Sequence, residues 1–292
     1  MKYGYYPGCI LPVAAKEYDI STREVFNALG VELVELEDWS CCGASAIYNI
    51  DHLLSFALPA RDLALAEKEG LDITTPCPVC YYNLWKVNEY TAEDPKLMDQ
   101  VNRALKGTGL EYKGTARVKH ILDVLANDVG VERIAEKVVR PLNDIKVVPY
   151  YGCFILRPPR KEPFDSVESP TSMDRILKAI GAEVIPWDMK TKCCGGTIIV
   201  TNEDVMTKLA YGLLSEAKAL DGDCISTPCP QCNMILDSKQ MDVERTYNEK
   251  ISMPVVYFTQ LIGLALGIDP RRLGFDLNIV PTEKLVATLK IS

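Results

Sequence analysis

Two nearly identical cysteine patterns occur in the two halves of the chain. The first reads C-x31-CC-x34-C-x2-C and the second reads C-x39-CC-x34-C-x2-C. The first set is Cys9, Cys41, Cys42, Cys77 and Cys80, and the second set is Cys153, Cys193, Cys194, Cys229 and Cys232. Thiolates are soft ligands that favour zinc or iron–sulfur centres. Each set therefore predicts a metal centre.

Each set contains one cysteine more than the four that a structural zinc or an ordinary cubane cluster needs. Because this surplus occurs twice, we interpret it as functional. Vicinal cysteines on a strand point to opposite faces, so both can bind one centre only where the backbone turns. Gly43 and Gly195 directly follow the two pairs and permit such a turn. The two neighbours can also bind different irons of an open cluster.

The composition limits the classes of function. Eleven cysteines, an odd number in a chain of 292 residues, argue against a secreted disulfide scaffold. The net charge of −8 argues against nonspecific binding of nucleic acid. The longest weakly polar run, residues 254–268, is shorter than the roughly 20 residues that a membrane span needs, and we interpret it as a buried helix. Because the first residues also fit a signal peptide poorly, we expect a cytoplasmic protein without a membrane span.

The sequence around the cysteines is duplicated as well. YYPGCI corresponds to YYGCFI, and TTPCPVC corresponds to STPCPQC. An insertion of eight residues between Cys153 and Cys193 accounts for the only difference in spacing. We therefore predict two copies of one unit, residues 1–140 and residues 141–292. The eleventh cysteine, Cys224, has no counterpart, and we expect a buried thiol on a strand.

Each copy predicts an α/β fold with a Rossmann-like parallel sheet. Short strands precede the first cysteine, the vicinal pair and the C-x2-C motif, and helical segments separate these strands. Parallel sheets of this kind bind ligands beyond the carboxyl ends of their strands. The five thiols of each copy are therefore expected to meet at one edge of the sheet. Residues 117–127 and 254–267 are predicted to form a closing helix in each copy.

This pattern resembles the cysteine-rich CCG domains, and two such domains in one chain resemble the B subunit of heterodisulfide reductase from methanogenic archaea. The resemblance implies a noncubane [4Fe-4S] cluster on the five cysteines of each copy. It also implies that the heterodisulfide of coenzyme M and coenzyme B is reduced to two thiols. We expect the disulfide to be cleaved between the two clusters.

The resemblance also implies partners. These are a ferredoxin-like C subunit, a flavin-containing A subunit, and a hydrogenase or formate dehydrogenase in the larger complex. No nucleotide or flavin is expected in this chain, because it lacks a Walker A motif and a G-x-G-x-x-G after a strand.

The implied substrate has sulfonate, carboxylate and phosphate groups, so an acidic chain needs a local basic patch to bind it. The basic residues near the second cysteine set are the candidates. They are Arg157, Arg160, Lys161, Lys190 and Lys192. The alternative is that these residues form a solvated surface or a docking face for another protein of the complex.

Two other functions fit the cysteine pattern. CCG domains also occur in iron–sulfur subunits of fumarate or succinate, glycolate and lactate oxidoreductases, where they transfer electrons between a flavoprotein and an acceptor. Many of those chains contain a C-x2-C-x2-C-x3-C motif, which is missing here; its absence favours a separate C subunit. In the second alternative, one or both sets hold zinc and only stabilise the fold or dock a partner.

Overall fold

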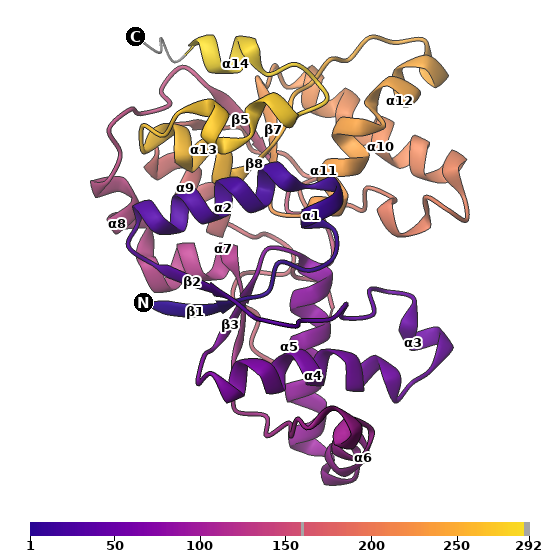
Figure 1. Ribbon diagram of the computed structural model, residues 1–292. Coiled ribbons are helices and arrows are strands. Elements are labelled where there is room, and N and C mark those ends of the chain that lie inside the picture. Colours follow the sequence, from indigo (N-terminus) through magenta and orange to yellow (C-terminus); the bar gives the residue numbers. More distant parts are fainter. Residues whose placement is uncertain (159–160, 289–292) are drawn as a thin grey trace.

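The computed structural model describes residues 1–158 and 161–288. Each half of the chain is built around its own four-stranded sheet, with strand order β2-β1-β3-β4 in the first and β6-β5-β7-β8 in the second (Figure 1). All neighbouring strands are parallel. The predicted duplicated α/β fold with parallel sheets is therefore confirmed.

The first copy contains four strands, and helices connect or follow them. The strands are β1 (Lys2–Tyr5), β2 (Glu32–Glu35), β3 (Ile73–Thr75) and β4 (Val118–His120). The helices are α1 (Leu11–Ala14), α2 (Lys16–Ala28), α3 (Ile47–Ile50), α4 (Leu54–Lys68), α5 (Pro78–Glu93), α6 (Pro95–Leu105), η1 (Lys106–Thr108), α7 (Ile121–Asp123), η2 (Val124–Gly130) and α8 (Val131–Glu136).

The second copy repeats this order. Its strands are β5 (Lys146–Pro149), β6 (Glu183–Val184), β7 (Cys224–Thr227) and β8 (Val255–Tyr257). Its helices are α9 (Ser172–Ala179), η3 (Gly196–Ile198), α10 (Glu203–Ala219), α11 (Pro230–Asn233), η4 (Met234–Ser238), α12 (Gln240–Tyr247), α13 (Phe258–Ala265), η5 (Pro270–Leu273), η6 (Phe275–Leu277) and α14 (Glu283–Thr288). Cys224 is fully buried on β7, as expected for the eleventh cysteine.

The prediction of a helix throughout residues 117–127 and 254–267 is wrong at the start of each segment. Both segments begin with a three-residue strand, β4 or β8, before the chain turns into a helix. The two strands have equivalent registers, because His120 lies opposite Thr75 and Tyr257 lies opposite Thr227. Three residues are too few to show the alternation by which a strand is recognised in sequence.

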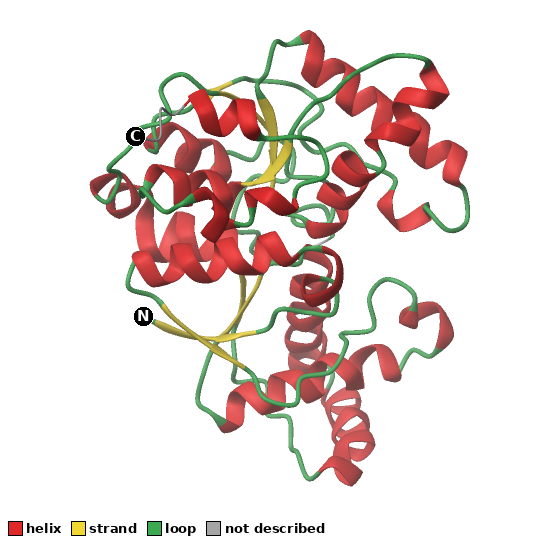
Figure 2. Cartoon of the chain, turned by 45° about the horizontal axis from the view of Figure 1, so that its top comes forward, coloured by secondary structure: helices red, strands yellow, loops and turns green. Residues whose placement is uncertain are grey.

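A shared apolar core lies between the two sheets. Helices α2 and α8 of the first copy pack against α13 and α9 of the second. Their buried side chains form one cluster that includes Phe26, Ile134, Ile176 and Leu261. Figure 2 shows this layer of helices between the two sheets. Each copy therefore buries one face of its sheet in an interface with the other copy.

The outer face of each sheet has its own core. Helices α4, α5 and α6 cover the first sheet, and α10, α11 and α12 cover the second. All eight residues of α13 are buried, which confirms a buried helix within residues 254–268. In the two described ranges, no helix is both long and apolar enough to cross a bilayer.

The chain passes from one copy to the other along the shared core. The backbone N–H groups of Val139 and Arg140 both donate to the carbonyl oxygen of Ala265, at 3.0 Å each. The end of the first copy is therefore hydrogen-bonded to the second copy. A boundary after residue 140 remains a prediction.

Glu17 on α2 supplies a pH-dependent element of this interface. The side chain is buried beside η5, and burial raises the pKa of Glu17 to about 7. A glutamate in an unfolded chain titrates near 4.3. Between about pH 4.3 and 7 the folded state binds the extra proton, so stability falls as the pH rises. We predict that Glu17→Gln reduces the fall in Tm between pH 5 and pH 7.5, measured by differential scanning fluorimetry at constant ionic strength.

The matched control is Glu111→Gln, because Glu111 is exposed. This variant should keep the wild-type dependence of Tm on pH. Part of the slope should remain in Glu17→Gln, since burial also raises the pKa of Asp62 to about 7 and that of Asp237 to about 6. An unchanged slope in Glu17→Gln would show that Glu17 does not titrate in this window.

Candidate metal centres

The carboxyl ends of β1, β2 and β3 bring the five cysteines of the first set together. The Sγ atoms of Cys9 and Cys41 are 3.8 Å apart, and those of Cys42 and Cys80 are 3.5 Å apart. Cys77 completes the group through a hydrogen bond with Cys80. Residues that are far apart in sequence thus form one group of thiols, because parallel strands end at the same edge.

The second set has the same arrangement at the ends of β5, β6 and β7. The Sγ atoms of Cys194 and Cys232 are 3.5 Å apart, the same distance as in the corresponding pair of the first set. Cys153 shares a hydrogen bond with Cys193, and Cys229 shares one with Cys232. The duplication therefore extends to the geometry of the thiols.

Glycines leave the space that the sulfur atoms occupy. Gly8 and Gly152 have φ angles of +72° and +70°, and a Cβ on either would lie 2.9 Å from the Sγ of Cys80 or Cys232. Gly43 and Gly195, which follow the vicinal pairs, have φ angles of +87° and +84°. L-residues with side chains rarely adopt these angles, so glycine is needed where the chain turns around the thiols.

Each set combines thiolates with protonated thiols. The pKa of Cys193 falls to about 6, because the Cys153 thiol and the Gly195 N–H donate to it and Arg157 is nearby. Hydrogen bonds from neighbouring thiols likewise lower the pKa of Cys42 and Cys194. A metal centre binds cysteines as thiolates. Binding of the metal must therefore release the protons of those thiols that are still protonated.

The donor set fits a multi-iron cluster. Each set supplies five thiols, whereas a tetrahedral zinc needs four ligands. In the second set, the backbone N–H groups of Gly195 and Gly196 donate to the Sγ atoms of Cys193 and Cys194 at 3.3 and 3.4 Å. Hydrogen bonds of this kind tune iron–sulfur clusters.

A tyrosine on each copy supports the turn before the vicinal cysteines. The hydroxyl of Tyr6 donates to the carbonyl of Ser40 at 2.6 Å, and the hydroxyl of Tyr150 donates to the carbonyl of Lys192 at 2.8 Å. Burial and the neighbouring thiolates raise the pKa of both phenols. Both tyrosines therefore remain protonated and hold the two turns in the same way.

The two cysteine sets are adjacent in space. Pro78 and Val79, between Cys77 and Cys80, line a small cavity together with all five cysteines of the second set. Tyr18 on α2 connects the two sites from the other side. Its hydroxyl donates to the carbonyl of Pro228 at 2.9 Å; burial raises the pKa of this phenol, and the charges of Cys229 and Cys77 add to that effect. One tyrosine thus lies near a cysteine of each set.

Two of the basic substrate candidates are engaged in ion pairs. Lys190 is mostly buried, and its Nζ lies 3.2 Å from Asp174. Lys161 is paired with Glu93 of α5, in the other copy. These contacts compensate the charges of both lysines and leave them less available to a substrate.

The other three candidates differ in their position. Arg157 is near the second set, since it lowers the pKa of Cys193 and donates to the Thr191 hydroxyl at 3.4 Å. Lys192 is exposed directly before the vicinal pair. Arg160 lies outside the described residues.

Sequence reasoning missed two ionisable side chains near the first set. Asp62 on α4 is fully buried and accepts hydrogen bonds from the backbone N and the hydroxyl of Ser40, at 2.7 and 3.1 Å. Lys86 on α5 is also buried. A comparison of the two copies could have found them, because neither residue is ionisable in the second copy. The positions equivalent to Asp62 and Lys86 are occupied there by Leu214 and Ser238.

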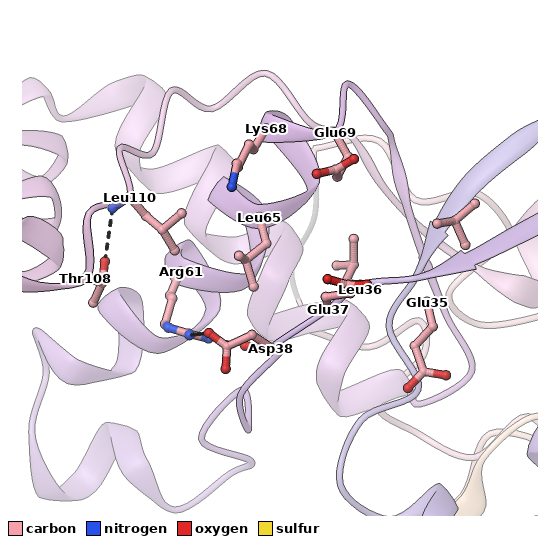
Figure 3. Close-up of a pocket in the computed structure, with 11 residues that line it drawn as sticks. Glu35, Leu36, Glu37, Asp38, Arg61, Leu65, Lys68, Glu69, Thr108 and Leu110 are labelled. Carbon is pink, nitrogen blue, oxygen red and sulfur yellow. Dashed lines mark hydrogen bonds and ion pairs between the residues drawn. The ribbon is translucent and has the colours of Figure 1, made fainter.

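Another pocket lies on the first copy beside β2 and α4 (Figure 3). No cysteine lines it. The guanidinium of Arg61 is paired with Asp38, to which it donates at both the carbonyl and the carboxylate. Because this cation is already compensated and no thiol is present, we assign the pocket no part in the redox chemistry.

Known proteins are similar to this chain in sequence and in fold. The family model described as a cysteine-rich domain, CCG, matches residues 3–85 and 147–237. The 8-methylmenaquinol:fumarate reductase membrane anchor subunit of Wolinella succinogenes is 38% identical, over 97% of this chain and 99% of that protein. The B subunit of the ferredoxin/F(420)H(2)-dependent CoB-CoM heterodisulfide reductase of Methanosarcina acetivorans is 32% identical, over 99% of this chain and 97% of that protein.

A solved structure has a similar fold. It is a hypothetical protein from Helicobacter pylori, with a TM-score of 0.77 and 14% sequence identity. The match covers 96% of this chain and 52% of that one. It supports the arrangement of the two sheets and adds nothing about activity.

The close approach of Gly8 to Cys80 leads to a testable prediction. A methyl group at residue 8 would overlap the Sγ of Cys80, so Gly8→Ala should lose the metal of the first set and keep that of the second. Metal per chain, measured by inductively coupled plasma mass spectrometry, should fall by about half. Gly152→Ala should have the same effect on the second set.

Gly70→Ala is the control for Gly8→Ala, because it strains the backbone without placing a methyl group against a thiol. Gly70 also has a positive φ, +66°, but no atom lies within 4 Å of the position that a Cβ would take there. This control should therefore retain the wild-type metal content. Full metal content in Gly8→Ala would show that the first thiol group does not need the space that Gly8 leaves.

Proposed function

The chain belongs to the CCG family, with one cysteine-rich domain in each half, and from this we propose that it is the catalytic iron–sulfur subunit of a heterodisulfide reductase. The proposed reaction is the reduction of the coenzyme M–coenzyme B heterodisulfide to two thiols. It consumes two electrons and two protons. The proposed cofactors are two noncubane [4Fe-4S] clusters, one on each five-cysteine set.

The observation that supports this proposal is the proximity of two equivalent thiol groups. A disulfide needs two electrons, whereas an iron–sulfur cluster commonly transfers one, and two bound clusters would supply the pair. The loop of Pro78 and Val79 from the first copy lies against the second cysteine set. Because this loop links Cys77 to Cys80, it places part of the first set beside the second.

The protein residues leave one side of each site open. Cys9 and Cys41 are exposed, and Cys153 and Cys193 are half-buried, whereas the cysteines of both C-x2-C motifs are buried. The C-x2-C side is thereby kept from water, while the other side can admit a substrate. Arg157 supplies positive charge beside the second site, and the exposed Lys192 directly precedes Cys193 in the chain.

The proposal includes the partners that reduction requires. Electrons would arrive from a ferredoxin-like C subunit and a flavin-containing A subunit, with a hydrogenase or formate dehydrogenase in the larger complex. The relatives in Methanosarcina are named as the B subunits of such reductases. We place the complex in the cytoplasm as part of the same proposal.

A second candidate function is supported by sequence identity. The relative with 38% identity is named as the membrane anchor of 8-methylmenaquinol:fumarate reductase. In this alternative the same two sites transfer electrons between a quinol and a fumarate-reducing flavoprotein. The distinction between the two candidates lies in the substrate, because both use the same cysteines.

We predict that single serine substitutions of the more accessible cysteines strongly impair disulfide reduction. Cys41→Ser and Cys193→Ser should each lower the rate of heterodisulfide reduction by reduced methyl viologen about 100-fold or more, since even indirect metal contacts are worth about 10- to 100-fold. Cys224→Ser is the control, because Cys224 is buried on β7 away from both sets. It should retain the wild-type rate.

The same assay separates the two candidates. Iron-loaded wild-type chain that reduces the heterodisulfide supports the first candidate. Chain that fails to reduce it, but whose clusters are reduced by a menaquinol analogue, supports the second. Equal rates in Cys41→Ser and the wild type would contradict a catalytic role for the first set.

A further inference from the structure

A pocket that the established family features do not explain lies beside the first cysteine set. Its cavity is ≈ 250 Å³ and is formed by the loop after Cys42, helix α3, the start of α4, α5, and Phe154 of the second copy. In Figure 1 these three helices lie together in the lower part of the molecule. At about 30 Å³ per water molecule, the cavity has the volume of roughly eight waters, which suits a small functional group.

Lys86 is the cation of this pocket. Its side chain is only 6% exposed, and its Nζ lies 4.7 Å from the ring centre of Phe56 and 5.6 Å from that of Tyr48. Within the described part of the chain, its ammonium has neither an ion pair nor a hydrogen-bond acceptor. Contacts with aromatic faces compensate only part of the cost of burying a charge. An anion in the pocket would supply the charge partner that this ammonium lacks among the described residues.

Other shielded lysines of this protein have carboxylate partners. Lys190 is paired with Asp174 at 3.2 Å, and Lys119 is paired with Asp128 at 2.6 Å. Lys86 is more buried than either and lacks such a partner among the described residues. Lys86 therefore differs from these two lysines in having no carboxylate beside it among the described residues.

The pocket shares a wall with the first cysteine set. Asn83 lines the cavity, and its Nδ2 donates to the carbonyl of Ala44 at 2.8 Å and to that of Cys42 at 3.2 Å. A group bound beside Lys86 would therefore lie against the loop that contains the vicinal cysteines. The rings of Tyr48 and Tyr90, which also line the pocket, are about half exposed and leave it open to solvent.

The lysine of this pocket is specific to the first copy. The position equivalent to Lys86 in the second copy is Ser238. The two thiol groups are nearly equivalent, yet the second has no lysine at the position from which Lys86 enters this pocket. Such a difference can orient a substrate whose two ends differ.

We propose that this pocket binds a small anionic group of the substrate, a sulfonate, carboxylate or phosphate, through Lys86. The inference rests on the proposed function, because it assigns one end of the disulfide to the first cysteine set. Tyr48, Phe56 and Tyr90 would surround the linker of that group. No bond is made or broken in the pocket, so its role is to bind and orient.

A simpler role for Lys86 must be separated from this one. Burial lowers the pKa of Lys86, while the charge of Cys42 raises it, so the lysine could act only as a counter-charge to the thiolates. A pure counter-charge would influence the reduction potential of the first site. It would not influence the affinity for a free anion.

Isothermal titration calorimetry with ethanesulfonate tests the proposal on the full chain, purified without oxygen. The wild type should bind ethanesulfonate, and Lys86→Met should bind it at least about tenfold more weakly, since one charge-assisted contact is lost. Lys86→Arg keeps the charge and should retain most of the affinity. Lys96→Met is the control, because Lys96 is an exposed lysine on α6 outside the pocket.

Dimethyl sulfone serves as a neutral ligand of similar shape. The proposal predicts that it does not bind measurably to the wild type, which provides a test that does not depend on the folding of a variant. Equal binding of the neutral ligand, or wild-type affinity for ethanesulfonate in Lys86→Met, would overturn the proposal. A shifted reduction potential in Lys86→Met with unchanged affinity would overturn it in favour of the counter-charge.

The proposed function can fail separately. Iron and sulfide analysis of the same preparation reports whether clusters are present. A chain without clusters that still binds ethanesulfonate through Lys86 would support the anion site and refute the reductase. A chain with both clusters that reduces the heterodisulfide but does not bind ethanesulfonate would refute the anion site and leave the proposed function standing.

Discussion

The crowding of five thiols at one edge of each sheet is the constraint on which the rest of the structure depends. Sulfur atoms 3.5–3.8 Å apart leave no space for side chains between them. Glycines with positive φ therefore occupy the turns next to the sulfurs, and a Cβ at Gly8 or Gly152 would collide with one of them. Buried tyrosines fix the turns by hydrogen bonds to the backbone. The parallel sheet is what brings the five positions together.

The shared helical core fixes the position of one thiol group relative to the other. Because helices α2, α8, α9 and α13 bury the inner faces of both sheets in one core, the two thiol groups are held at fixed positions beside each other. Tyr18 and the Pro78–Val79 loop connect them directly. If each group holds a one-electron cluster, as proposed, the pair would suit a two-electron substrate. The copies have diverged around the thiols, as Lys86 and Asp62 show, so equivalent thiol geometry coexists with different surroundings.

Much of this arrangement could be predicted from sequence, because spacing in a repeat is a strong signal. The duplicated parallel sheets and the meeting of the ten cysteines at strand ends were predictable from the order of strands, helices and thiols. The strands β4 and β8 were not, since three residues show no alternation. Nor were the partners of the basic residues. The ion pair between Lys161 and Glu93 joins the two copies, and only their packing reveals it.

The central claim is that both cysteine sets hold four-iron clusters. The most direct test is the amount of iron, acid-labile sulfide and zinc per chain in protein purified without oxygen. The account predicts about eight irons, about eight sulfides and no stoichiometric zinc, the sum of two four-iron clusters. About four irons together with one zinc would contradict it, because one set would then be structural and the two-site reduction of a disulfide would have to be abandoned.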